Sequence, residues 1–419
     1  NSPTLCQLYV AWALQPLRTK YPNFLIYHYM DDILIAKRTT ITAEEKQTVF
    51  TTLQQRGLVI APEKLQEQPP WRYLGWLITD AQIRPQKIHL NTTIATLRDT
   101  QTLLGDLQWV RPIAGITNDK LSPLLPWLKG TTANEPRTVT EEQHHALQAI
   151  SEKLQCVWVS RRDESLPLSL WVVNTEQHPF AILCQWQSRK TGEELRLLEW
   201  LFLPLQPKVS ILSRSEALGC LIRRGRDRAT VIAGEDLATI SIPVRSEDLE
   251  WQLRHSLPLQ EAPLDFGGVV HNQQPKGKVW QVLKGQQWIE KPWASTTPVE
   301  GRTIFTDAGR KSCTAACVWK ENDKWKTHLI KGDQKDSLQT LELAAICWAF
   351  QQCAKEPLNV VTDSLYAAGV AQRIEDALLK QVANCRLNML FQTLCRTLNQ
   401  RSSPYCVIHI RNHLWDQGL

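Results

Sequence analysis

The sequence predicts a multidomain protein of mixed α/β and α+β class. Its 419 residues are too many for one ordinary core, so about two to four domains are expected. Hydrophobic residues make up 43% of the chain, a normal fraction for a globular protein. Segments with strand periodicity alternate with segments of helical periodicity, without an internal repeat or a low-complexity tract.

The composition and the two ends of the chain indicate which classes of protein are expected and which are not. No apolar run is long enough to cross a bilayer, so no membrane partner is expected. The eleven cysteines contain no Cys-x-x-Cys pair, which indicates free thiols in a reduced, intracellular setting and argues against zinc. The net charge of +6 permits a polyanionic partner without proving one. The chain lacks an initiator Met and a signal peptide and stops abruptly at HLWDQGL, so we expect a piece of a longer product.

The first 165 residues are predicted to pass from mixed structure to helix. Apolar runs predict two β-hairpins on either side of a helix that begins at Thr42 and ends at Gly57. Pro16 should kink or shorten the helix that opens the chain. From residue 88 onward the periodicity is helical. The predicted elements are helices at 4–19, 42–57, 93–110 and 140–155, strands at 23–30 and 33–38, and a second hairpin at 71–85.

The rest of the chain is predicted to be mixed. Residues 166–298 combine short strands with loops, and Pro, Gly and Lys enrichment marks 271–301 as a linker. In residues 299–419, three antiparallel strands are followed by helix, strand, helix and strand, which predicts a mixed α/β domain. The predicted strands are 168–174, 180–186, 301–309, 313–320, 325–331, 358–364 and 405–413, and the predicted helices are one at 337–353 and one or two at 374–400.

Two adjacent acids, Asp31 and Asp32, stand between the first two strands, in the string YMDD. Successive side chains of a strand point to opposite faces, but at a hairpin tip both carboxylates can approach one cation. Two Mg²⁺ ions held in this way can activate a 3′-hydroxyl and neutralise a leaving pyrophosphate. The alternative is an ordinary Asp-rich turn. Chance alone would produce the full string in on the order of one in a thousand chains of this length.

This segment resembles the metal-binding turn in the palm of a retroviral reverse transcriptase. The opening NSPTLCQ resembles the continuation of that family's nucleotide-pocket motif. In RYLGWLI, Tyr73, Leu74 and Gly75 resemble the primer grip. LLGDLQWVRPIAGI and LSPLLPWLKG resemble thumb segments of betaretrovirus-like Pol, of the endogenous retrovirus K type.

Three residues of the predicted thumb helix would lie on one face. Gln101, Gly105 and Trp109 are spaced i, i+4, i+8. The glycine would let the backbone approach a duplex, while Gln and Trp present a donor and a flat apolar surface to a minor groove. The resemblance favours this interpretation over its alternative, in which the helix packs on a neighbour through Gly105.

A second group of acids lies in the C-terminal domain. Asp307 and Asp363 end predicted strands, where ligands collect in α/β sheets, and Glu342 lies on a mostly apolar helix, where an unpaired charge is costly. A shared pair of Mg²⁺ ions would remove that cost. The alternative is three unrelated surface acids. In this order on these elements, the acids resemble those of ribonuclease H.

The resemblance to ribonuclease H implies roles for four further residues. Gln339 would contact the minor-groove edge of RNA, and Ser364 and Tyr366 would grip the DNA strand. His413 resembles the mobile histidine that helps to release product, although a His near a chain end is otherwise commonly solvated. The implied reaction is metal-assisted attack of water on an RNA phosphodiester in an RNA/DNA hybrid, leaving a 3′-hydroxyl.

The resemblance also implies an organisation and a set of partners. The expected domains are a partial polymerase palm at 1–87, a helical thumb at 88–165, a connection and linker at 166–298, and ribonuclease H at 299–419. The partners would be an RNA template, a DNA primer, an RNA/DNA hybrid and dNTPs, with two Mg²⁺ ions in each active site. The implied location is intracellular: virion-associated in a parent virus, or cytoplasmic if an endogenous locus is expressed.

The sequence departs from the family at three points. The third polymerase carboxylate and the nucleotide-pocket glutamine would precede NSPT, and the fourth ribonuclease H acid would follow the last residue, because Asp416 is too close to His413 to replace it. Ala308 stands where the family commonly has glycine. The sequence therefore leaves open whether the chain is an enzyme or a silent remnant that only binds hybrid. A host protein that shares the ribonuclease H fold is disfavoured, because the resemblance spans the whole chain.

We predict that these 419 residues alone extend no primer, because they would hold only part of the polymerase metal site. Incorporation of dNTPs on an RNA template would contradict this. We also predict weak or no hybrid cleavage, since one missing acid reduces charge neutralisation without removing the substrate grip. Restoring the C-terminal segment of the family should then raise cleavage sharply.

Overall fold

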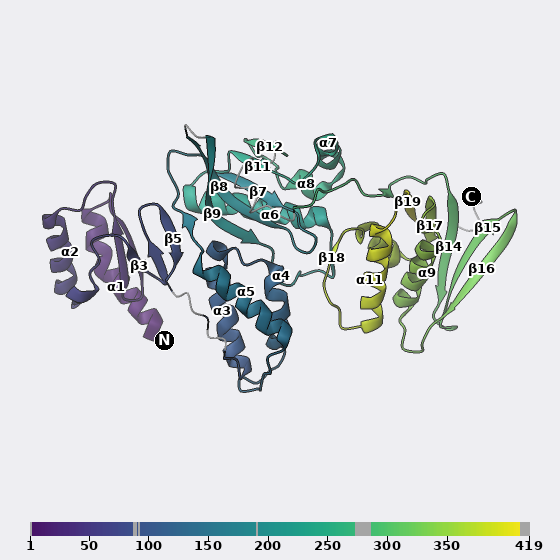
Figure 1. Cartoon of the computed structure of the whole chain (residues 1–419), viewed down its shortest axis with the longest axis horizontal. Helices are drawn as coiled ribbons and strands as arrows, with labels where there is room; N and C mark the ends of the chain where they lie inside the picture. The colour runs from purple at the N-terminus through teal and green to yellow at the C-terminus, as the bar shows by residue number, and fades with distance from the viewer. Residues whose placement is uncertain (1, 87–89, 91–92, 190–191, 273–285, 411–419) are drawn as a thin grey trace. The chain divides into compact units, whose positions relative to one another are not determined.

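The computed structural model describes residues 2–86, 90, 93–189, 192–272 and 286–410 (Figure 1). The described residues form two compact units. The first contains Asn1–Ile116, Pro123–Glu164 and Arg196–Glu199, and the second contains Thr117–Ser122, Ser165–Leu195 and Trp200–Leu419. Both combine helices with sheets, so the predicted mixed fold class is confirmed. Among the described helices, none has the length and apolar composition that spanning a bilayer requires.

The first unit opens with a two-stranded hairpin covered by helices. Helices α1 and α2 pack against one face of the hairpin, around a core that includes Leu14, Ile26 and Leu53. Helix α1 continues through Pro16, so the expected shortening does not occur. A capping box between Thr42 and Glu45 begins α2. The elements are α1 (Ser2–Lys20), β1 (Leu25–Tyr29), β2 (Asp32–Ala36), α2 (Ala43–Gln55) and a 3₁₀ helix (Pro62–Lys64).

A four-stranded sheet and two long helices complete this unit. The sheet has the order β3-β4-β5-β6, and all its pairs are antiparallel. Capping boxes at Thr96 and Thr140 begin the two long helices, and Gly115, with a φ of 62°, ends the first of them. The elements are β3 (Trp71–Tyr73), β4 (Trp76–Ile78), β5 (Gln82–Pro85), α3 (Leu97–Ala114), a 3₁₀ helix (Ser122–Leu128), α5 (Glu141–Gln155) and β6 (Val159–Ser160).

The second unit contains a five-stranded sheet of order β12-β11-β7-β8-β9 with a long helix, α6, packed on it. A Cβ at Gly225 of α6 would lie only 2.5 Å from the side chain of Leu170 in β7, so glycine permits this close approach. The prediction of only strands and loops here was wrong. The elements are α4 (Asn118–Leu121), β7 (Ser169–Val173), β8 (Phe180–Arg189), β9 (Gly192–Phe202), α6 (Arg214–Ala233), β11 (Thr239–Ser241), α7 (Ser246–His255), α8 (Leu257–Glu261) and β12 (Val269–His271).

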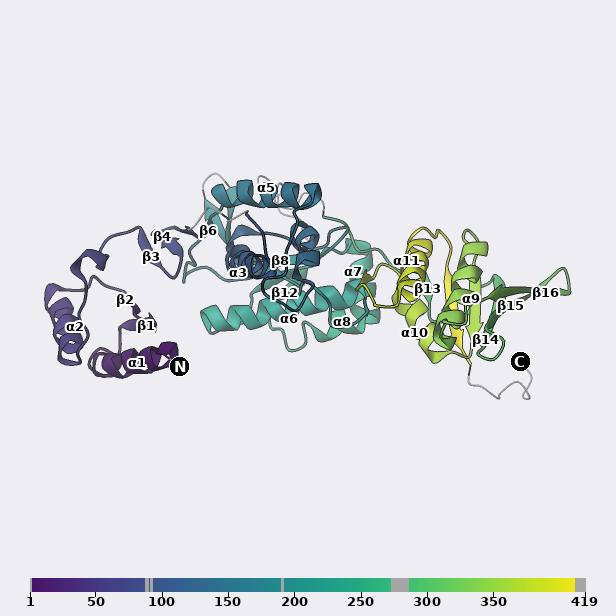
Figure 2. The same ribbon diagram turned by 90° about the horizontal axis from the view of Figure 1, so that it is seen from below.

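The same unit ends in a six-stranded mixed sheet of order β13-β19-β17-β14-β15-β16. Figures 1 and 2 show α9 and α11 on the same side of this sheet. The predicted strands of this region are found as far as the structure describes them; residues 411–413 of the last one lie outside the described residues. Of the one or two helices predicted at 374–400, one is found, which begins only at Cys385, and α10 lies before this range. The elements are β13 (Ala294–Ser295), β14 (Arg302–Gly309), β15 (Thr314–Glu321), β16 (Lys324–Lys331), α9 (Leu338–Gln352), β17 (Leu358–Thr362), α10 (Leu365–Arg373), α11 (Cys385–Asn399) and β19 (Tyr405–His409).

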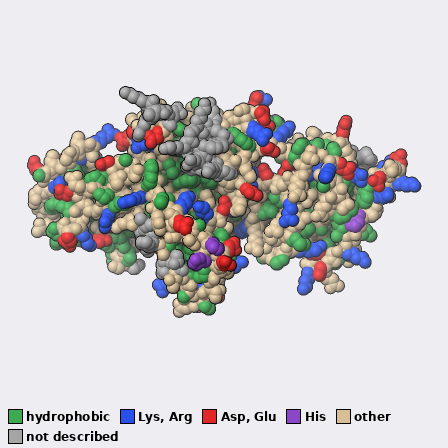
Figure 3. Space-filling view, in the orientation of Figure 1, with side chains coloured by type: hydrophobic (Ala, Val, Ile, Leu, Met, Phe, Trp, Pro, Cys, Tyr) green, Lys and Arg blue, Asp and Glu red, His purple; other side chains and the backbone are tan. Residues whose placement is uncertain are grey.

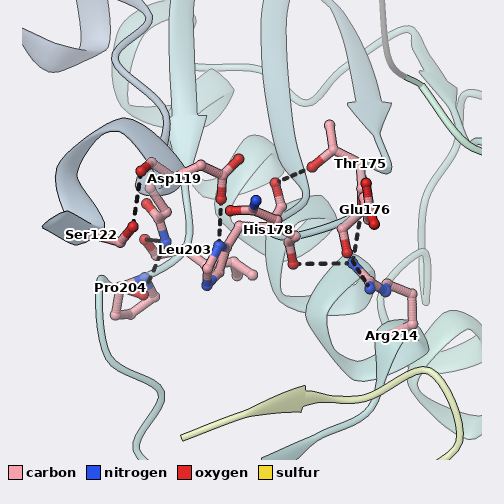
Figure 4. A network of polar contacts seen from close by, with 10 residues as sticks. Asp119, Ser122, Thr175, Glu176, His178, Leu203, Pro204 and Arg214 are labelled. Carbon is pink, nitrogen blue, oxygen red and sulfur yellow. Dashed lines mark hydrogen bonds and ion pairs between the residues drawn. The ribbon is translucent and has the colours of Figure 1, made fainter. Parts of the chain in front are cut away.

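Arg214, the first residue of α6, connects the two sheets of the second unit. Its guanidinium donates to the backbone carbonyls of Thr175 and Glu176 beside the first sheet (Figure 4) and to that of Asp376 beside the second. Two short strands, β10 (Ile211–Leu212) and β18 (Leu378–Leu379), pair antiparallel at the same place. One half-buried arginine thus joins three segments that are far apart in sequence.

The carboxyl group of Asp376 lies at this junction. Burial raises the pKa of Asp376 to about 7, the charge of Arg214 opposes the shift, and the neighbouring Glu375 adds to it. The folded protein therefore holds a proton on Asp376 in a pH range where the unfolded chain has released it.

Substituting Asp376→Asn should remove a pH-dependent loss of stability. In the wild type, the free energy of unfolding should fall as pH rises from about 4 to about 7, by at most about 1.4 kcal/mol per pH unit. The variant should lack this part of the slope in urea denaturation series. Asp323→Asn is the matched control, because Asp323 also has a φ near +60° but is exposed. Equal slopes for Asp376→Asn and the wild type would contradict this assignment.

Candidate active sites

The three acids of the C-terminal sheet come from neighbouring elements. Strands β14 and β17 are parallel neighbours in which Thr306 pairs with Thr362. Asp307 and Asp363 therefore follow at the same end of adjacent strands. Helix α9 packs on β14 and carries Glu342 in its second turn. Three elements thus bring the three carboxylates to one edge of the sheet.

Glu342 is half-buried and lies within electrostatic range of the other two acids. Burial raises the pKa of the Glu342 carboxyl, and the charges of Asp363 and Asp307 raise it further. A hydrogen bond from the Ser364 hydroxyl to Glu342 Oε2 acts in the opposite direction. Without a cation, three negative groups meet at a half-buried position. Such an arrangement is costly unless positive charge is supplied.

The turn between β1 and β2 is a tight hairpin. Tyr29 pairs with Asp32 across it, and Met30 has a φ of 57°, which is a left-handed conformation. Gln7 of α1 stabilises the turn, because its Oε1 accepts a hydrogen bond of 2.6 Å from the Met30 N–H. The side chains of Asp31 and Asp32 are both exposed, so ligands can reach both carboxylates. The sequence prediction did not include Gln7.

The turn between β3 and β4 lies within electrostatic range of Asp32. Burial raises the pKa of the Tyr73 phenol, and the charge of Asp32 raises it further. Leu74 and Gly75 have φ values of 48° and 81°, and they make the two-residue turn of this hairpin. The first unit therefore brings the predicted grip segment near the acidic turn.

Helix α3 presents the predicted polar and aromatic face. Gln101, Gly105 and Trp109 are all exposed, and Trp109 retains 56% of its accessible surface. A Cβ at Gly105 would meet no described atom within 4 Å, so the alternative of a helix packed on this glycine is not found. The ring of Trp109 stacks on that of Trp76 in β4, with centroids 5.9 Å apart.

Four family models match the chain, and together they cover most of it. They describe a reverse transcriptase (RNA-dependent DNA polymerase) at residues 1–78, a reverse transcriptase thumb domain at 85–148, an ERVK-8-like, RNaseH-like domain at 176–280 and RNase H at 300–415. The chain belongs to the retroviral reverse transcriptase and ribonuclease H family. It is of the betaretrovirus-like type. The third match covers most of residues 166–298, which the sequence analysis expected to be a connection and linker.

Curated relatives agree with this assignment. The chain is 32% identical over 419 residues to the Gag-Pro-Pol polyprotein of squirrel monkey retrovirus. It is 32% identical over 418 residues to that of mouse mammary tumor virus (strain BR6), and 31% identical over 421 residues to that of Mason-Pfizer monkey virus. Each alignment covers 99% of this chain. The chain spans 22–23% of the length of these relatives.

The remaining predicted residues of the ribonuclease H domain differ in their environments. Gln339 is exposed one turn before Glu342 on α9, and Tyr366 is half-buried against the core of the domain. His413 lies outside the described residues. His409, which the sequence prediction did not include, has Nε2 3.2 Å from the backbone oxygen of Asp363. It lies at the end of β19, directly beside the acids.

Reverse transcriptase and ribonuclease H domains are generally dependent on divalent metals. In the part of the chain that the structure describes, no three His, Cys, Asp or Glu side chains are gathered closely enough to form a finished metal site. Asp307, Glu342 and Asp363 have the chemistry that such a site needs, because they are carboxylate oxygen donors on neighbouring elements, and the charges of Asp363 and Asp307 raise the pKa of the Glu342 carboxyl group. The charge distribution gives no comparable signal: on the face that Figure 3 shows, Lys and Arg side chains are interspersed with Asp and Glu.

Asp363→Asn should stabilise the metal-free protein. The substitution removes one negative charge beside Glu342, so the free energy of unfolding in EDTA should rise, but only by a few tenths of a kcal/mol, because water screens charges at this part-exposed position. Addition of Mg²⁺ or Mn²⁺ should stabilise the wild type more than the variant. Urea denaturation with and without metal measures both effects.

Glu300→Gln is the control for this experiment, because Glu300 is an exposed acid of the same domain. It should change neither the stability in EDTA nor the gain on adding metal. Two results would contradict a cluster of acids that repel one another: a lower stability of Asp363→Asn than of the wild type in EDTA, or an equal gain in stability on adding metal to the wild type and to Asp363→Asn.

Proposed function

We propose that this chain is part of an enzyme that processes RNA/DNA hybrids: Asp31 and Asp32 would be two of the carboxylates of an RNA-directed DNA polymerase site, and Asp307, Glu342 and Asp363 would be three of the acids of a ribonuclease H site. The observation that carries the proposal is the placement of Asp307 and Asp363 at the same end of the parallel neighbours β14 and β17, with Glu342 on the helix packed against β14. The Gag-Pro-Pol identity of the relatives supports it, although the chain spans less than a quarter of their length.

The ribonuclease H residues have separate tasks in this proposal. Asp307, Glu342 and Asp363 would hold Mg²⁺, which supplies an activated water and neutralises charge on the scissile phosphate. The exposed Gln339, one helical turn from Glu342, would contact the minor-groove edge of the RNA strand. Tyr366 would contact the DNA strand, and so would Ser364 if its hydroxyl were released from Glu342.

The polymerase residues divide their work in a similar way. Asp31 and Asp32 would supply carboxylates for two Mg²⁺ ions at the primer 3′-end, with the RNA template, the DNA primer and dNTPs as substrates. Tyr73, Leu74 and Gly75 would hold the primer through the turn near Asp32. The open face of α3 formed by Gln101, Gly105 and Trp109 would follow the minor groove of the duplex.

Ala308, which stands where the family commonly has glycine, causes no backbone strain. Ala308 lies in the extended strand β14, paired with Ala315, and its N–H donates to Asp307 Oδ1 at 2.7 Å. Alanine adopts this conformation without strain, so the replacement of glycine does not by itself favour the silent hybrid-binding remnant. For location we propose the intracellular setting of a Pol product, virion-associated in a virus.

The experiment incubates the chain with labelled RNA/DNA hybrid and a divalent metal. We expect slow cleavage of the RNA strand that requires Mg²⁺ or Mn²⁺ and ends when Asp363 is changed to Asn. Hybrid affinity should decrease as salt rises and should be the same in both proteins. If the chain binds hybrid but does not cleave it, and still does not cleave it after the C-terminal segment of the family is restored, the proposal of an enzyme is wrong. The chain would then be a catalytically silent remnant that binds hybrid.

A further inference from the structure

The short loop between β17 and α10 connects two of the three acids. Asp363 lies in this loop, and Ser364 follows it as the N-cap of α10. The Ser364 hydroxyl accepts a hydrogen bond of 3.1 Å from the Ala367 N–H and donates one to Oε2 of Glu342. The Ser364 N–H donates to Thr362 Oγ1 at 3.2 Å. One side chain therefore caps α10 and contacts an acid on α9.

This cap differs from other caps in the chain. Helices α2, α3, α5 and α6 begin with capping boxes, in which the N3 side chain bonds back to the N-cap residue. The N3 residue of α10 is Ala367, which has no group to do so. The Ser364 hydroxyl instead donates its proton to Glu342 on another helix.

The Ser364 side chain is nearly enclosed. It is only 8% exposed, and both the donor and an acceptor position of its hydroxyl are occupied. A contact with the DNA strand would require this hydroxyl to leave Glu342. Its present partner is instead a carboxylate that two other acids repel.

A half-buried Glu has several rotamers, and repulsion from Asp363 and Asp307 favours those that turn toward solvent. The hydrogen bond from Ser364 opposes this by holding Oε2 on the side of the other two acids. Among the described residues, no other hydrogen bond to the Glu342 carboxylate is found. Its other oxygen, Oε1, is therefore available to a cation.

We propose that Ser364 is a positioning residue of the ribonuclease H site, whose hydroxyl holds Glu342 beside Asp307 and Asp363 so that the three carboxylates share a divalent cation. The inference rests on the proposed function. It assigns to Ser364 a task that differs from direct contact with the DNA strand. Residues that orient metal ligands in this way commonly change metal affinity by about 10- to 100-fold.

The test separates the hydroxyl donor from the helix cap. Ser364→Ala removes both, whereas Ser364→Gly removes the donor with only a small loss of capping, and Ser364→Thr keeps the hydroxyl. Asn384→Ala is the matched control, since Asn384 caps α11 in the same domain through a hydrogen bond of 3.0 Å from the Leu387 N–H. Calorimetry measures Mn²⁺ binding, and further assays measure hybrid affinity, thermal stability and the Mg²⁺ dependence of cleavage.

We expect Ser364→Ala and Ser364→Gly to weaken Mn²⁺ binding by about 10-fold and to leave hybrid affinity unchanged. The binding measured is that of the Mn²⁺ site that Asp363→Asn abolishes. Ser364→Thr should restore it, and Asn384→Ala should lower only the thermal stability. Unchanged Mn²⁺ affinity in Ser364→Ala, or a loss of hybrid affinity alone, would overturn the inference and leave the proposed function intact. If the wild type has no Mn²⁺ site that depends on Asp363, the proposed function itself fails.

Discussion

The placement of three carboxylates at one end of the C-terminal sheet is the constraint on which the account of this domain depends. Parallel pairing of β14 with β17 fixes Asp307 and Asp363 at one sheet edge, and the buried apolar side of α9 fixes Glu342 against them. Neither the strands nor the helix can separate these charges without loss of core packing around residues such as Phe350. The hydrophobic core therefore stabilises a charge arrangement that would otherwise be unfavourable, as is common at functional sites.

The acidic turn of the first unit also brings carboxylates close together, but in another way. Asp31 and Asp32 are adjacent in sequence, so no tertiary packing is needed to bring them together. A left-handed Met30 and the side chain of Gln7 define the turn, and both acids remain exposed, where water screens their repulsion. In this hairpin, local backbone geometry alone brings the carboxylates together, whereas in the ribonuclease H domain the packing of three elements is needed.

Features that depend on local sequence could be predicted, and features that depend on tertiary packing could not. The turn and the C-terminal strands follow from local apolar patterns, and the order of the three acids indicated a common site. Helix α6 was missed, although the capping box at Ser213 and Gly234 at its end mark its limits; its two glycines lower its helix propensity. The bond from Ser364 to Glu342 and the role of Gln7 depend on tertiary contacts, which no spacing reveals.

The central claim is that Asp307, Glu342 and Asp363 form one binding site for a divalent cation. Diffraction from crystals of the chain soaked in Mn²⁺, recorded at an energy where manganese scatters anomalously, tests it most directly. We expect an anomalous peak within coordination distance of all three carboxylates, at about 2.1–2.3 Å from their oxygens. A well-ordered site without such a peak, or a peak held by other side chains, would contradict the account.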